Sequence, residues 1–287
     1  MRPIRHLFFL SSFLVILVPL AAQPDDWSLY DERMARFSET NQTDSFIFYN
    51  EAMVQLARKG DDLRLWISAR LDLADYYYEH DQEEAWSRQL AETCAGKWRE
   101  PRTPQEWETL CYLQSDRGYS LVQTGKMLQA IPVLQDAAAM YERFRFEDLD
   151  PLESIYKPLG NCFTKLGDND KALAVFFKSL LFNGDNETMA GLYCNLGIAF
   201  WNKGDYEAAE KYHRQGLALP GLSNAKRGLL LGALAQTLLD EGRTAQAARY
   251  ATESLALLAK ENAGDRSILE YRCYSRRTAG IAYTRLG

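Results

Sequence analysis

The sequence has few of the residues that catalytic and metal sites need. It contains only three histidines in 287 residues, and His80 and His213 are the two outside the N-terminal segment. Neither has an acid or a cysteine at the spacing of a metal site, and no nucleophile elbow, phosphate-binding loop or dinucleotide fingerprint occurs. We therefore expect no enzyme activity, no metal ion and no small-molecule cofactor. His213 is expected to pack in the core.

Positive charge and linker-forming residues are also scarce. The 33 Lys and Arg residues are outnumbered by 39 Asp and Glu, which leaves a net charge of −6, and no basic block occurs. Nucleic-acid binding needs a clustered excess of basic residues, so we expect no nucleic-acid partner. The nine prolines are spread thinly and no Gly/Ser-rich tract is present. One continuous architecture is therefore favoured over separate domains joined by a linker.

The longest apolar run lies at the N-terminus. Arg2 and Arg5 precede apolar residues 7–20, which are followed by Ala21 and Ala22. This is the plan of a signal peptide, and the run falls short of the ~20 residues of a membrane-spanning helix. We predict a signal peptide over residues 1–22, cleavage near Ala22, and export to the periplasm or the cell exterior. An uncleaved membrane anchor is the alternative.

The cysteines do not form a recognisable framework. They are Cys94, Cys111, Cys162, Cys194 and Cys273, an odd number without Cys-x-x-Cys spacing. Neither a zinc site nor a set of disulfides is indicated. We expect buried single thiols that pack as small apolar side chains, with a bridge between Cys94 and Cys111 as the alternative.

A repeat occupies most of the remaining chain. Three copies share a leucine, a small residue, a large apolar residue, a glycine, an alanine and a further packing position at constant offsets. The copies are Leu159, Gly160, Phe163, Gly167, Ala172 and Phe176; Leu196, Gly197, Phe200, Gly204, Ala209 and His213; and Leu234, Ala235, Leu238, Gly242, Ala247 and Ala251. Upstream, the same frame fits Gly118, Leu121, Gly125, Ala130 and Leu134, and at the end it begins again at Gly280, Tyr283 and Gly287.

Each copy has the pattern of a helical hairpin. Apolar residues recur at three- and four-residue spacing on both sides of the glycine, which is typical of two amphipathic helices. The glycine can end the first helix in a left-handed conformation. Asp168 and Asp205 can then accept hydrogen bonds from the free amides of the second helix. Small residues such as Gly160 and Gly197 allow the paired helices to approach closely beside large ones.

These residues resemble the tetratricopeptide repeat (TPR) family. The resemblance implies an all-α fold, a right-handed superhelical solenoid of antiparallel helix hairpins over residues 23–287. The expected repeats are at about 111–141, 153–184, 190–221 and 228–259, with weaker hairpins at 26–60 and 61–100 and a truncated repeat at 273–287. The leader resembles those of exported proteins from bacteria of the Bacteroidetes type. An irregular helical bundle is the alternative fold.

The resemblance also implies a function. Such scaffolds bind proteins or peptides on a concave face lined by the first helix of each hairpin. Carried over to this sequence, the groove residues are Tyr119, Lys157, Asn161, Lys165, Asn195, Ile198, Trp201, Asn202 and Gln236. We therefore expect a protein or peptide ligand. For Trp201 the alternative role is packing against the next hairpin.

Part of this groove resembles the carboxylate clamp of chaperone-binding TPR proteins. Lys157, Asn161 and Asn195 occupy clamp positions, and their ammonium and amide groups would bind a carboxylate. The two remaining cationic positions of the clamp fall at Leu229 and Ala233, which breaks the pattern. The alternative is that these asparagines only cap or bridge neighbouring helices.

The sequence ends at the turn of a repeat whose second helix is missing, so we expect a fragment of a longer protein. Exported arrays of this kind resemble the sensor halves of bacterial histidine kinases and helix-turn-helix regulators, and the arrays that precede a CHAT-type protease domain. The alternative function is therefore recognition within such a protein. A membrane contact is expected only if an unseen C-terminal segment supplies it.

Overall fold

The protein is a stack of helices. The computed structural model describes residues 28–40, 42–182, 184–262 and 264–287, in which the chain forms thirteen α-helices, one π-helix and no β-strand. The elements are α1 (Ser28–Glu39), α2 (Thr43–Lys59), α3 (Leu63–Glu79), α4 (Glu83–Gly96), α5 (Pro104–Gln123), α6 (Met127–Phe144), η1 (Leu152–Tyr156), α7 (Lys157–Lys165), α8 (Asn169–Ser179), α9 (Asn186–Asn202), α10 (Tyr206–Leu217), α11 (Asn224–Asp240), α12 (Thr244–Leu258) and α13 (Arg266–Leu286). The predicted signal peptide, residues 1–22, lies outside these ranges.

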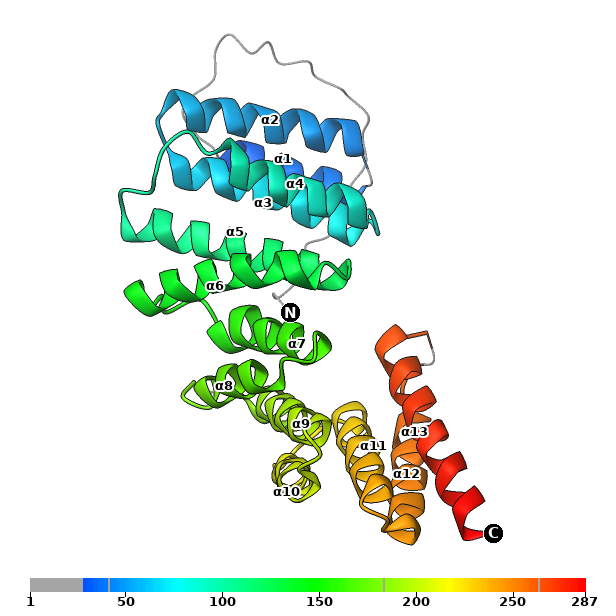
Figure 1. Ribbon diagram of the computed structural model, residues 1–287. Coiled ribbons are helices and arrows are strands. Elements are labelled where there is room, and N and C mark those ends of the chain that lie inside the picture. The colour runs from blue at the N-terminus through cyan, green and yellow to red at the C-terminus, as the bar shows by residue number, and fades with distance from the viewer. Residues whose placement is uncertain (1–27, 41, 183, 263) are drawn as a thin grey trace.

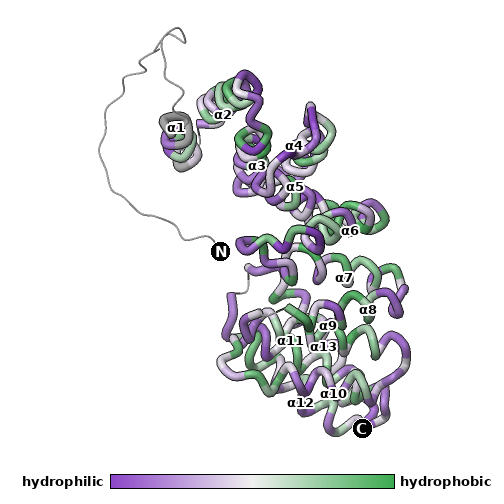
Figure 2. Tube along the Cα trace, turned by 90° about the vertical axis from the view of Figure 1, so that its left-hand side faces the viewer, coloured by the Kyte–Doolittle hydropathy of each residue, from purple (hydrophilic) through white to green (hydrophobic). Residues whose placement is uncertain are grey.

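Consecutive helices pair into hairpins that stack one after another along the chain (Figure 1). Helices α1–α6 lie nearly level across the stack, whereas α11–α13 are steeply inclined, so the stack twists into a superhelix (Figure 1). Hydrophobic and hydrophilic residues alternate along the helices, as expected for helices that bury one face (Figure 2). The predicted all-α repeat superhelix is confirmed.

The later hairpins place their first helices in one layer. In the hairpins α5/α6, α7/α8, α9/α10 and α11/α12, each first helix contacts the first helix of the next hairpin. The last helix, α13, packs on both α11 and α12 and so takes the place of a further first helix. We refer to α5, α7, α9, α11 and α13 as the inner layer.

The turns of these hairpins depend on left-handed residues. Gly125, Gly167, Gly204 and Gly242 have φ between 75° and 89°, as the repeat frame predicts. In the turn between α3 and α4 no glycine is available, and Asp81 adopts φ 57° instead. Aspartate tolerates this conformation better than most side chains do. The α3/α4 hairpin therefore has the same kind of turn without the glycine that marks it in the sequence.

The starts of the second helices are capped as expected. A carboxylate oxygen of Asp168 accepts a hydrogen bond from the Lys171 amide at 3.3 Å, and Asp205 accepts one from the Ala208 amide at 3.0 Å. These carboxylates satisfy amides that have no partner inside the helix. The caps therefore mark where α8 and α10 begin.

Capping residues also decide where the first helices begin. Asp185 accepts a hydrogen bond from Thr188 N at 2.7 Å, and Ser223 Oγ accepts one from Lys226 N at 3.2 Å. Asp265 caps α13 through Ser267 N at 2.8 Å. These helices consequently start ahead of residues 190, 228 and 273, near which the repeats were expected to begin.

Small residues on first helices face large ones on second helices. A Cβ atom on Gly160 would lie 2.2 Å from Phe176 Cε1, and one on Gly197 would lie 2.2 Å from His213 Nε2. Phe176 and His213 are both buried, so the packing role expected for His213 is confirmed. The close approach of α7 to α8 and of α9 to α10 therefore requires glycine at these positions.

A compact charge cluster ties the N-terminal hairpins to α5. The Arg99 guanidinium binds Glu106 through two hydrogen bonds of 2.6 and 3.0 Å and reaches Asp61 Oδ1 at 2.9 Å. Arg99 and Glu106 are 12% and 9% exposed at their side chains, whereas the neighbouring pair of Arg102 and Asp61 is 65% and 51% exposed. Glu106 also accepts a hydrogen bond from the Arg102 amide at 2.6 Å. The buried half of this cluster orders the entry into α5.

All five cysteines are free thiols. Cys94 donates a hydrogen bond to Gln114 and Cys111 to the Ala137 carbonyl, so the alternative bridge between them does not form. Cys111, Cys162 and Cys194 are buried, as expected for small packing residues, and burial raises the pKa of the Cys194 thiol to about 12. Cys273 is exposed and departs from that expectation.

Candidate functional site

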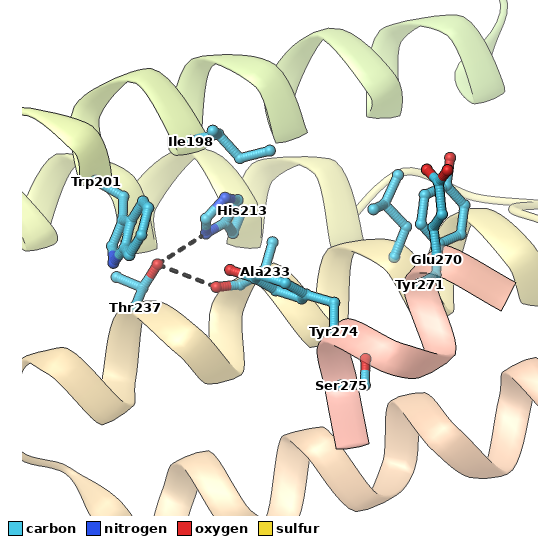
Figure 3. Close-up of a pocket in the computed structure, with 10 residues that line it drawn as sticks. Ile198, Trp201, His213, Ala233, Thr237, Glu270, Tyr271, Tyr274 and Ser275 are labelled. Carbon is cyan, nitrogen blue, oxygen red and sulfur yellow. Dashed lines mark hydrogen bonds between the residues drawn. The ribbon is translucent and has the colours of Figure 1, made fainter. Parts of the chain in front are cut away.

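A hollow opens in the inner layer between α9, α11 and α13. Its volume is about 310 Å³, and side chains from these three helices and from α10 point toward it (Figure 3). Its lining residues are Ile198, Trp201, His213, Leu229, Ala233, Thr237, Glu270, Tyr271, Tyr274 and Ser275. Most of these groups are aliphatic or aromatic, and the polar ones are few. The hollow is therefore suited to a bulky apolar group with polar atoms near it.

One wall of the hollow is held by a polar network. Trp201 Nε1 and Gln236 Nε2 each donate a hydrogen bond of 2.8 Å to the same Asp240 carboxylate oxygen. Gln236 Oε1 in turn accepts a hydrogen bond from the Thr278 hydroxyl of α13 at 2.9 Å. Trp201 therefore stands at the hollow with its indole N–H already satisfied, which leaves its ring for contact with a ligand.

The floor of the hollow contains a buried histidine. His213 is 1% exposed, and its Nδ1 lies 3.4 Å from the Thr237 hydroxyl (Figure 3). Burial lowers the pKa of His213 to about 4, with a smaller opposing effect from the Cys194 backbone. The imidazole is therefore neutral at pH 7, and the floor carries no charge.

His213 is expected to make folding stability depend on pH. Because its folded-state pKa lies below 6.5, the unfolded chain binds a proton between about pH 6.5 and 4 that the folded chain does not. The free energy of unfolding should therefore fall as the pH drops through this window. In the preceding hairpin, Phe176 packs against Gly160 as His213 packs against Gly197. The variant His213→Phe should therefore keep the packing and flatten the dependence of the free energy of unfolding on pH. Urea unfolding at pH 7, 6, 5 and 4.5 measures it, and equal slopes in both proteins would contradict the assignment.

The wall from α13 was not found by sequence reasoning. Glu270, Tyr271 and Tyr274 line the hollow from the first turns of α13, at three- and four-residue spacing. These residues lie before or at the edge of the truncated repeat predicted at 273–287. Asp265 followed by an apolar-periodic stretch was the signal that would have placed the helix start correctly.

The nine residues assigned to the groove from the resemblance lie in four places. Ile198 and Trp201 line the hollow, and Gln236 is buried beside it. Lys157, Asn161 and Asn195 lie along α7 and α9, partly buried, in the inner layer. Lys165 and Asn202 are exposed at the ends of their helices, where Asn202 donates a hydrogen bond to Asn169. Tyr119 packs edge-on against Trp86, far along the chain from the hollow.

The structure also shows the surroundings of the residues at the predicted carboxylate-clamp positions. Lys157 is paired with Glu153 through Oε2 at 2.6 Å. Leu229 and Ala233, where the clamp needs cations, line the apolar hollow. A second ammonium comes from Lys226, one helical turn before Leu229, and sequence reasoning missed it. No group of three or more His, Cys, Asp or Glu side chains in the described ranges is arranged to hold a metal ion.

The sequence was compared with protein-family models and with curated proteins. The family model of the tetratricopeptide repeat matches residues 190–220, which hold most of α9 and all of α10. No curated protein matches the chain. None of the helices in the described part of the chain is long and apolar enough to span a membrane.

Several solved structures share the fold. BtubC (BKLC) from P. vanneervenii is 17% identical, with 83% of this chain and 95% of that one covered and a TM-score of 0.60. A tetratricopeptide repeat protein from Parabacteroides merdae is 13% identical, with coverages of 90% and 91% and a TM-score of 0.59. YrrB, a TPR protein with an unusual peptide-binding site, is 17% identical, with coverages of 68% and 87% and a TM-score of 0.50. Residues 190–220 thus match the tetratricopeptide repeat by sequence, and the described helices share the fold of solved TPR structures.

Proposed function

We propose that the chain is a peptide-binding scaffold that anchors a bulky apolar side chain in the hollow between α9, α11 and α13. The observation that carries this proposal is the wall composition, in which Trp201, Tyr271 and Tyr274 surround a space of about 310 Å³. Aromatic side chains at a partly open pocket are typical anchors of protein and peptide interfaces. YrrB, which has the same fold, is described as a TPR protein with an unusual peptide-binding site.

The volume of the hollow supports the proposal that it holds one side chain of a peptide. Its volume lies at the lower end of the range of about 300–1,000 Å³ that small-molecule pockets occupy. It lies between helices of the inner layer, in which α9 also contacts α7. The fold is a scaffold and no catalytic group is needed for this role. Export by residues 1–22, and recognition within a longer regulator or CHAT-type protease protein, stay predictions.

Trp201→Ala tests the anchor. We expect it to weaken binding of a peptide selected on the wild-type protein roughly thirtyfold, because a central aromatic anchor contributes about 2 kcal/mol or more. Isothermal titration calorimetry measures the affinity, and circular dichroism checks that the helices remain.

Phe48→Ala is the matched control for this test. Phe48 is a 54% exposed aromatic on α2, away from the inner layer, so its removal should leave peptide affinity unchanged. Equal losses in the two variants, or no loss from Trp201→Ala, would count against the hollow as the anchor site.

A further inference from the structure

Two ammonium groups meet over a glycine of α9. A Cβ atom on Gly191 would lie 3.3 Å from Lys226 Nζ and 3.5 Å from Lys157 Nζ, so the two ammonium groups are within about 7 Å of each other. Lys157 reaches this point from α7 and Lys226 from α11, on opposite sides of α9. Because Gly191 has no side chain, both ammonium groups can approach the backbone of α9 at this point.

Three carboxylates lie near this point, and each of them already has a partner of its own. Glu153 pairs with Lys157. Asp185 is the cap of α9, where it accepts the Thr188 amide at 2.7 Å, and Glu187 binds the Ser223 hydroxyl at 3.1 Å. Lys226 forms no salt bridge among the described residues, although its charge is one of the smaller causes that lower the pKa of Asp185. An ammonium group has three donors, so Lys157, with one carboxylate partner, and Lys226 both keep donors for charge-assisted hydrogen bonds with an added carboxylate.

The pair of lysines adjoins the hollow. Gly191, Asn195 and Ile198 follow one another at four- and three-residue spacing on α9, which places them on one face. Seven residues of helix separate Gly191 from Ile198 by roughly 10 Å. An extended peptide covers that distance in about three residues. On α11, Leu229 of the hollow lies one turn after Lys226.

We propose that the peptide ligand carries an acidic side chain about three residues from its apolar anchor, and that Lys157 and Lys226 bind this carboxylate over Gly191. The inference rests on the proposed function, since the hollow must hold the anchor. A side chain fits better than a chain terminus, because Leu229 and Ala233 are apolar walls and offer no second set of donors to a terminal carboxylate. The site thus defines a ligand class, an acid paired with a bulky apolar residue.

Selection from a random twelve-residue peptide library displayed on phage tests this class. Against the wild-type protein we expect enrichment of Asp or Glu three residues from an aromatic or large aliphatic residue. Against Lys226→Ala the apolar residue should persist and the acid should be lost. Lys211→Ala, which removes an exposed lysine from the outer helix α10, should select the same sequences as the wild type.

Affinity measurements with one selected peptide, acetylated and amidated at its ends, give the second readout. Replacing its acid by Gln should weaken binding about fivefold to the wild type and little to Lys226→Ala. Gly191→Glu, which supplies a carboxylate from α9 itself, should weaken binding of the acidic peptide more than the equally large Gly191→Gln does. The acid-dependent part should also shrink as salt is raised.

The possible outcomes separate the two proposals. Enrichment of an apolar residue without an acid, or an acid preference that survives Lys226→Ala, overturns the lysine site and leaves the hollow intact. An acid effect that appears only as a free C-terminal carboxylate overturns the side-chain assignment. If no sequence is enriched at all, peptide binding in the hollow is itself contradicted, and this inference fails with it.

Discussion

Gly160→Ala is expected to lower the free energy of unfolding by about 1–3 kcal/mol. The new Cβ would lie 2.2 Å from Phe176 Cε1 and 2.7 Å from Cδ1, closer than atoms can approach, and Phe176 is fully buried. Either α7 and α8 must move apart or the phenyl ring must leave its position. Alanine favours the helix by about 1 kcal/mol over glycine, but this gain is smaller than the cost of the overlap. Urea unfolding followed by circular dichroism measures the change.

Gly280→Ala is the matched control. Gly280 is also inside a helix, α13, but a Cβ there would meet no atom within 4 Å. This variant should be more stable than the wild type by about 0.5–1 kcal/mol, because only the helix preference acts. In the Gly160→Ala background, Phe176→Leu should recover part of the loss. If both glycine variants were equally stabilising, the close approach of α7 and α8 would be refuted.

Arg99→Ala should destabilise the N-terminal half by about 2–4 kcal/mol. The substitution removes both hydrogen bonds to Glu106, whose carboxylate is 9% exposed and would remain charged without its partner. Arg99 is also the main cause that lowers the pKa of Glu106 to about 2. That stabilisation is present above the ordinary carboxyl pKa and is lost as the pH falls toward 2. Thermal unfolding at pH 7 measures the effect.

The exposed half of the same cluster provides the comparison. Arg102 pairs with Asp61 at 2.7 Å, but both side chains are more than half exposed. Arg102→Ala should therefore cost less than about 1 kcal/mol. Adding Glu106→Gln to Arg99→Ala should restore stability in part, because the stranded charge is removed. If Arg102→Ala and Arg99→Ala lowered the free energy of unfolding equally, burial would not explain the stabilisation by the Arg99–Glu106 pair.

The hairpins from α7 to α12 follow from local sequence. Gly167, Gly204 and Gly242 mark turns that need positive φ, and the apolar spacing on both sides is set within one hairpin. Asp81 adopts the left-handed conformation that glycine adopts in the other turns. The α3/α4 turn is therefore of the same kind, but the repeat pattern in the sequence is weaker there. In a solenoid each repeat contacts only its neighbours, so the fold class can be inferred from short segments.

Only some residues of the hollow could be predicted from the sequence. Ile198 and Trp201 were placed by the repeat frame because they lie on one face of a first helix. Tyr271, Tyr274 and Lys226 were not, because their approach to α9 depends on how α11 and α13 are rotated about it. That rotation is the sum of packing at several helix interfaces, and a small change in each moves a side chain into or out of the hollow.

The sequence by itself determined that this chain is a stack of helical hairpins with glycine turns and aspartate caps, since those features depend on backbone conformation over a few residues. Only the tertiary structure decided that α9, α11 and α13 enclose an apolar hollow, and that two lysines 69 positions apart meet over Gly191. Contacts between separate repeats depend on the superhelical twist, which no single repeat encodes.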